Sequence, residues 1–144
     1  MIHDQLNAGM PLPPFSRWVA FHPGIPGCDS VQLHEQSLAG PAAVLLVGDK
    51  PLVICGIALL SERVGEAWTV IADEKHEFPL LLTRAVKQAI AITVKSHNLH
   101  RVQMTVNSAS NEAVRWAFAL GFTVEALMRK YGDDESDHYL FVRL

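Results

Sequence analysis

The residues best suited to chemistry gather where a strand-like run gives way to a helix. The segment WTVIADEKHEFPLLLTRAV starts at Trp68 as a β-like stretch, passes through charged residues and reaches Pro79, which suits the first turn of a helix. Backbone N–H groups at a helix N-terminus attract anions, so this junction predicts an anion-binding site. Lys75, His76 and Arg84 are the side chains that would assist it.

The same junction lacks the glycines that usually let a backbone close around a phosphate. No glycine occurs between Gly65 and Gly121. Pro79 has no backbone N–H to donate, and Glu74 and Glu77 add negative charge beside the helix start. Two interpretations stay open: a phosphate site rebuilt from other residues, or one that has been lost.

Other catalytic patterns are missing from the sequence. His97 and His100 lie three residues apart with no third ligand nearby, and no HExxH or Cys–His spacing occurs, so we expect no metal. No G-x-S-x-G motif marks a serine nucleophile. Cys28 and Cys55 are far apart, and Cys55 sits in the apolar run LVICGIALL, so we expect a buried free thiol there.

Length and composition predict one soluble domain. The 144 residues carry a formal net charge of −3, without a basic block, which argues against a nucleic-acid or membrane-surface partner. The longest apolar run, residues 52–60, is about half the ~20 residues that a membrane-spanning helix needs. No signal peptide is evident, so a cytoplasmic location is expected. The domain divides into an atypical, proline-rich part (1–40) and a core (41–144).

The apolar pattern of the first half of this core predicts the elements that position the junction. Three β-like runs separated by the turns GDKP and ERVG indicate a β-meander. The third run alternates, which places Glu66, Trp68 and Glu74 on one face. A long amphipathic helix then starts at Pro79.

The second half adds a strand (101–106), a shorter helix and a closing β-hairpin. Ser110 or Asn111 is expected to cap the helix, and Gly121 follows it at a position that favours positive φ. A mixed sheet with one helix on each face is the simplest packing.

Several motifs together resemble the GNAT superfamily of N-acetyltransferases, which transfer an acyl group from acetyl-CoA to an amine. SNEAVRWAFALGFTVEALMR, which starts at Ser110, is similar to the family signature N-x-x-A…L-G-F-x-x-E-x-x-x-R. LHRVQMTV (99–106) and DHYLFVRL (137–144) resemble two of its strands. The resemblance covers residues 41–144.

The resemblance implies an α+β fold with a mixed, mostly antiparallel central sheet, flanked by helices, and a shortened N-terminal helical part. Two neighbouring strands would splay, parting near Ile71, and the V-shaped cleft between them would hold the cofactor. In the family, a backbone N–H of the splayed strand donates a hydrogen bond to the thioester carbonyl. In this chain that N–H would belong to Val70, Ile71 or Ala72. Asn111 resembles the asparagine that contacts the pantetheine arm, although Ser110 fits the same place.

The implied reaction is direct attack of an amine on the thioester. Glu66 and Glu74 are then candidate bases, and Tyr131 is a candidate proton donor. Solvated positions for both glutamates and a packing role for the tyrosine are the alternatives. Ala117 stands where many members carry a tyrosine that protonates the thiolate.

The cofactor site is where this chain departs from the pattern. The family's pyrophosphate loop [RQ]-x-x-G-x-[GA] falls at KHEFP (75–79), where Lys75, His76 and Arg84 would have to act as ligands for acetyl-CoA.

A narrower resemblance links the chain to small GNAT-like proteins of tailed bacteriophages. It implies an alternative, a non-catalytic structural or interaction protein, with virion proteins as partners and the host cytoplasm or the virion as its location. The exposed edges of a splayed sheet also allow a homodimer.

Overall fold

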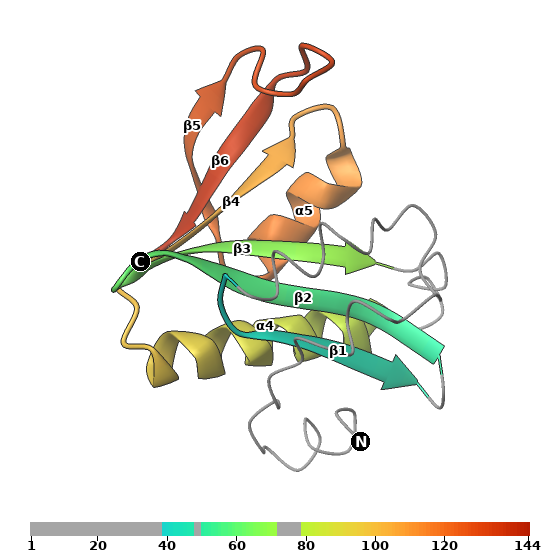
Figure 1. Ribbon diagram of the computed structural model, residues 1–144. Helices are drawn as coiled ribbons and strands as arrows, with labels where there is room; N and C mark the ends of the chain where they lie inside the picture. Colours follow the sequence, from blue (N-terminus) through green and yellow to red (C-terminus); the bar gives the residue numbers. More distant parts are fainter. Residues whose placement is uncertain (1–38, 48–49, 72–78) are drawn as a thin grey trace.

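The computed structural model describes residues 39–47, 50–71 and 79–144, which form six strands and two helices (Figure 1). The predicted meander, long helix, strand, short helix and hairpin are all confirmed within these residues. The elements are β1 (Ala42–Val47), β2 (Lys50–Ser61), β3 (Val64–Ile71), α4 (Pro79–Ser96), β4 (Arg101–Asn107), α5 (Asn111–Ala119), β5 (Thr123–Met128) and β6 (His138–Arg143).

The strands form a single mixed sheet in the order β1-β2-β3-β4-β6-β5. Only β3 and β4 are parallel, because the long crossover through α4 joins them. The other four pairs are antiparallel. The predicted α+β class with a mixed, mostly antiparallel sheet is therefore confirmed.

The sheet splits between β3 and β4. These strands pair over three residues each, Val64–Glu66 with Arg101–Gln103, and β4 then turns away to pair along its length with β6 (Figure 1). The sequence led us to expect the separation near Ile71, which was wrong, because the pairing already ends at Glu66. The sheet is thus two units, β1-β2-β3 and β4-β6-β5, that share a short common edge.

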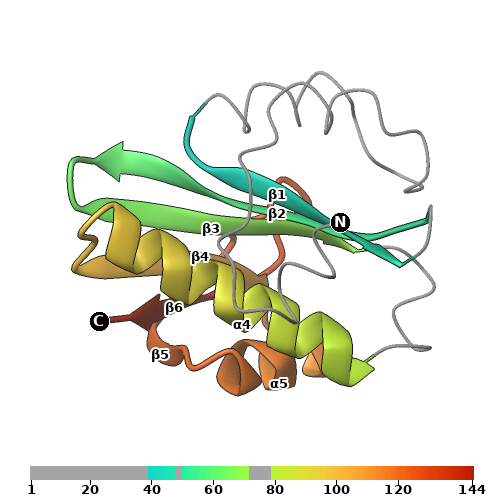
Figure 2. The same cartoon turned by 90° about the horizontal axis from the view of Figure 1, so that it is seen from below.

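Both helices pack on the same face of the sheet. Figure 2 shows α4 and α5 next to one another on one side of the strands. Trp116 of α5 donates its Nε1–H to Thr83 Oγ1 of α4 at 3.0 Å, and Phe118 of α5 stacks edge-on against Phe141 of β6 at 5.2 Å. The expectation of one helix on each face was wrong for these two helices. The crossovers β3-α4-β4 and β4-α5-β5 run in the same direction across the sheet, and crossovers of the same hand then place their helices on the same face.

The short helix α5 begins and ends as its sequence predicts. Ser110 is the N-cap, and its hydroxyl accepts a hydrogen bond from the Ala113 amide at 3.3 Å, which decides between the two capping candidates. Leu120 ends the helix, and Gly121 follows at φ +92, as expected. The turn lets the fully buried Phe122 enter the core next to Phe141.

Candidate active site

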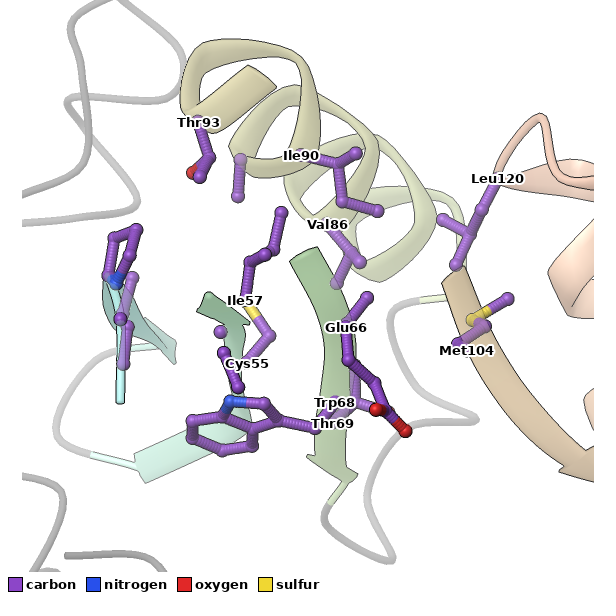
Figure 3. A pocket seen from close by; sticks show the side chains of 18 of the residues that line it. Cys55, Ile57, Glu66, Trp68, Thr69, Val86, Ile90, Thr93, Met104 and Leu120 are labelled. Atoms are coloured by element: carbon purple, nitrogen blue, oxygen red, sulfur yellow. The ribbon is translucent and has the colours of Figure 1, made fainter. Parts of the chain in front are cut away.

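A large cleft opens where β3 and β4 diverge. Its volume is about 1240 Å³, and it extends under α4 and along the start of α5. Figure 3 shows Val86 and Ile90 descending from α4, Glu66 on β3, and Met104 on β4 at the other side of the opening. This volume exceeds the roughly 300–1,000 Å³ typical of small-ligand pockets, so an extended ligand fits.

The edge of β3 that faces the cleft has backbone groups that pair with no strand among the described residues. From Ala67 to Ile71, β3 pairs with β2 on one side, whereas its register with β4 ends at Glu66. In an antiparallel pair, successive residues direct their N–H and C=O groups alternately toward and away from the partner. Every second residue of this segment therefore points its polar backbone groups into the opening. Ile71 lines the cleft and Val70 lies beside it on β3, while Ala72 lies outside the described residues.

The cleft wall is mostly apolar and bears little charge. Among the described residues that line it, Glu66 is the one carboxylate, and no lysine or arginine is present. The Glu66 side chain is half-buried and lies on the β4 side of β3 in Figure 3. A carboxylate on an apolar wall favours a ligand that is cationic or that donates hydrogen bonds.

Trp68, on the same face of β3 as Glu66, packs against Gly56 of β2. A Cβ atom at Gly56 would lie 2.6 Å from Trp68 Cζ2 and 2.9 Å from the Pro41 carbonyl oxygen, so only glycine fits. Trp68 Nε1 is buried and has no hydrogen-bond partner among the described residues. Neither feature was predicted; the glycine inside the apolar run LVICGIALL was the available signal, because a strand-interior glycine often marks a close approach.

Cys55 also lines the cleft as a free thiol, as predicted, although the residue is half-buried and not fully buried. Burial raises the pKa of the Cys55 thiol to about 12, because desolvation disfavours the thiolate. The thiol is protonated at neutral pH and is therefore no nucleophile.

The start of α4 supplies backbone donors but few side-chain ligands. The amides of Leu80 and Leu81 lie in the first turn and have no acceptor within the helix, and no acidic residue occupies that turn. Arg84 is exposed on the outer side of α4 and is not among the residues that line the cleft. Lys75, His76 and Glu74 lie outside the described residues, so the expected ligand set stays a prediction.

Two other predicted residues lie away from the cleft wall. Asn111 is the exposed first residue of α5. Tyr131 is 53% exposed after β5, with its ring 5.4 Å from that of His138. Asn107, which the sequence did not single out, does line the cleft, and its Oδ1 accepts from the Ala109 amide at 2.9 Å. Its place at the end of β4, just before a helix, was the available signal.

In the described part of the chain, no three His, Cys, Asp or Glu side chains come close enough to hold a metal ion. Within the same residues, neither helix is long and apolar enough to cross a membrane.

No family model matches the sequence, and no curated protein matches it. Solved structures do match. A spermidine/spermine N-acetyltransferase of Vibrio cholerae shares 18% sequence identity at a TM-score of 0.66, and the match covers 81% of this chain and 75% of that one. A GNAT-family acetyltransferase of Streptococcus pneumoniae shares 21% sequence identity at a TM-score of 0.66, and the match covers 80% of this chain and 73% of that one. The fold is the GNAT acetyltransferase fold.

A third match places the same fold in an enzyme with a protein acceptor. The ribosomal-protein-S5-alanine acetyltransferase of Vibrio fischeri shares 22% identity at a TM-score of 0.64, over 79% of this chain and 66% of its own. At these identities the likeness concerns the GNAT fold alone, because function depends on the residues of the site.

Proposed function

We propose that this protein is an N-acetyltransferase that transfers the acetyl group of acetyl-CoA to an amine by direct attack. The observation that carries the proposal is the edge of β3 beyond Glu66, which pairs with no described strand and lies in a cleft large enough for an extended ligand. Backbone N–H groups fixed in a strand are preorganised donors for an oxyanion.

In this reaction the amine nitrogen attacks the thioester carbon, and the carbonyl oxygen becomes negative. An N–H of the segment Val70–Ala72 stabilises that oxygen, and such donors are each worth about 2.7–4 kcal/mol in other enzymes. The C–S bond then breaks, the CoA thiolate leaves, and it takes a proton from Tyr131 or from solvent, since Ala117 has no hydroxyl. Glu66 takes the proton that the amine loses, directly or through one water. Glu74 is the second candidate base, and Tyr131 the candidate donor.

The cofactor's diphosphate would lie at the N-terminus of α4. The helix dipole contributes only about 0.3–1 kcal/mol at an exposed end, so cationic side chains must supply the rest. Lys75, His76 and Arg84 are the proposed ligands, and Asn111 the proposed contact to the pantetheine arm. Long side chains on a helix lean toward its N-terminus, which brings Arg84 within reach of that end.

Binding of acetyl-CoA tests the first half of the proposal. At ~100 times the dissociation constant, a ligand stabilises the folded state by roughly 2.7 kcal/mol, which calorimetry or a thermal shift detects. Arg84→Glu should weaken this binding at least tenfold. Lys87→Glu, which makes the same charge change one turn further along the exposed side of α4, is the matched control and should not. Equal affinities for both variants would remove Arg84 from the site.

Catalysis tests the second half. Release of CoA is followed with a thiol reagent in the presence of spermidine, lysine or a peptide that begins with alanine, since two fold neighbours are named for a polyamine and a protein alanine. Glu66→Gln should lower kcat at least a hundredfold without changing acetyl-CoA affinity. An unchanged kcat would move the base to Glu74.

The second candidate function is a GNAT-fold structural or interaction protein without catalysis. The absence of lysine and arginine from the described cleft wall favours it. No thermal shift at millimolar acetyl-CoA would select this function over transfer. A phage origin, virion partners and a cytoplasmic location remain predictions from the sequence.

A further inference from the structure

The indole of Trp116 begins a chain of two hydrogen bonds that ends at the first turn of α4. Its Nε1–H donates to Thr83 Oγ1 at 3.0 Å, and the Thr83 hydroxyl donates to the Pro79 carbonyl oxygen at 3.0 Å. Chemistry fixes the direction of both bonds, because an indole nitrogen can only donate and a hydroxyl has a single hydrogen. The chain therefore runs one way, from α5 through a side chain of α4 to the backbone of the residue that opens α4.

The donor from α5 distinguishes this chain from an ordinary helix contact. A threonine hydroxyl often bonds the carbonyl four residues earlier in its own helix, so the bond from Thr83 to Pro79 is unremarkable by itself. Trp116, however, belongs to another helix and lines the cleft. Figure 2 shows α5 beside the N-terminal half of α4, where the two helices meet. Trp68 also lines the cleft, but its Nε1 has no partner among the described residues.

The far end of the chain determines the direction of the Leu80 amide. The Pro79 carbonyl and the Leu80 N–H belong to one planar peptide unit, so holding the oxygen also orients the hydrogen. Pro79 has no N–H, so the Leu80 amide is the first donor of α4, and it has no acceptor within the helix. Hydrogen bonds in a chain also polarise one another, which strengthens this N–H as a donor.

We propose that Trp116 and Thr83 are positioning residues for the diphosphate of acetyl-CoA. They act through the Pro79 carbonyl, which directs the Leu80 N–H toward the anion. The inference rests on the proposed function, since it needs the diphosphate to lie at the N-terminus of α4. It explains how a helix start without glycine offers an oriented donor. A bond that only held the two helices together would stabilise the fold and leave the affinity for CoA unchanged.

The test is the affinity of the full chain for CoA, measured by calorimetry, with the Leu80 amide signal followed by NMR. Trp116→Phe keeps an aromatic ring and removes the N–H, and Thr83→Val keeps the shape and removes the hydroxyl. Each should raise the dissociation constant about fivefold, which corresponds to one net hydrogen bond. The double variant should bind no more weakly than either single variant, because both act through the same chain. Thr83→Ser keeps the hydroxyl and should restore the affinity of the natural chain.

Phe118→Leu is the matched control, because it removes an aromatic contact of the same helix, with Phe141 of β6, and leaves the chain of bonds intact. It should lower the free energy of unfolding without changing the affinity for CoA. Circular dichroism establishes that each variant is folded.

The outcomes separate this inference from the proposed function. A natural chain that does not bind CoA at millimolar concentration would overturn both. A natural chain that binds CoA no more tightly than Trp116→Phe and Thr83→Val would overturn this inference alone. So would a Phe118→Leu variant that binds as weakly as Trp116→Phe, or a Leu80 amide signal that CoA leaves unmoved.

Discussion

Replacing Gly56 by alanine tests how tightly Trp68 is held at the cleft wall. The new Cβ would lie 2.6 Å from Trp68 Cζ2, 2.7 Å from Cε2 and 2.9 Å from the Pro41 carbonyl oxygen. Overpacking of this kind costs about 1–3 kcal/mol. Alanine in a strand interior otherwise gains about 0.5–1 kcal/mol over glycine. The net expectation is a loss of about 1–2 kcal/mol in the free energy of unfolding.

A double-mutant cycle identifies the atoms responsible. Gly56→Ala is compared in the natural chain and in a Trp68→Leu background, where the indole is gone but the Pro41 carbonyl remains. The cost should fall by at least ~1 kcal/mol in that background, because contacting residues couple by about 0.5–3 kcal/mol. Urea unfolding followed by far-ultraviolet circular dichroism suits both backgrounds, since the signal does not depend on the tryptophan.

Two results would contradict this reasoning. An equal cost in both backgrounds would show that the indole can leave Gly56 freely and that the carbonyl alone resists the new atom. A neutral or stabilising Gly56→Ala in the natural chain would show that the packing between β2 and β3 is looser than the structure has it.

Two further predictions concern conformation and titration. Gly121→Ala should lower the free energy of unfolding by about 1–2 kcal/mol through its φ of +92 alone, since nothing lies within 4 Å of the added Cβ; urea unfolding checks it, and a neutral result would mean the turn can relax. Because the folded-state pKa of Cys55 is raised from 9.0 to about 12, its contribution to stability is complete below pH 9 and is lost as the pH rises toward 12. The stability of Cys55→Ala should therefore fall less steeply than that of the natural chain over this window, and parallel curves would refute the assigned burial.

The order of elements was predictable because each carries a local signal. Alternation marked the strands, Pro79 opened α4, and Gly121 ended α5 at positive φ. The pairing length of β3 with β4 was not predictable, because it depends on how far β6 draws β4 away. The shared face of the two helices was not predictable from local patterns either, since it follows from the strand order, in which both crossovers run the same way across the sheet.

The site was predictable only where a residue's position on a strand decides its direction. Alternation along β3 placed Glu66 beside Trp68, and both line the cleft. Asn107 was missed, because its role at the cleft depends on where β4 ends after diverging. Motif spacing favoured Asn111 instead, and that residue lies on the exposed side of α5's first turn.

The seam between the two units of the sheet has a mechanical consequence. Only three residue pairs, Val64–Glu66 with Arg101–Gln103, join the two units through the sheet, so we expect the seam to act as a hinge. On the helix side, the bond from Trp116 to Thr83 limits how far the hinge opens. A ligand bound in the cleft between the two units would hold them at a fixed angle. Hydrogen exchange of the backbone amides should then slow in both units together.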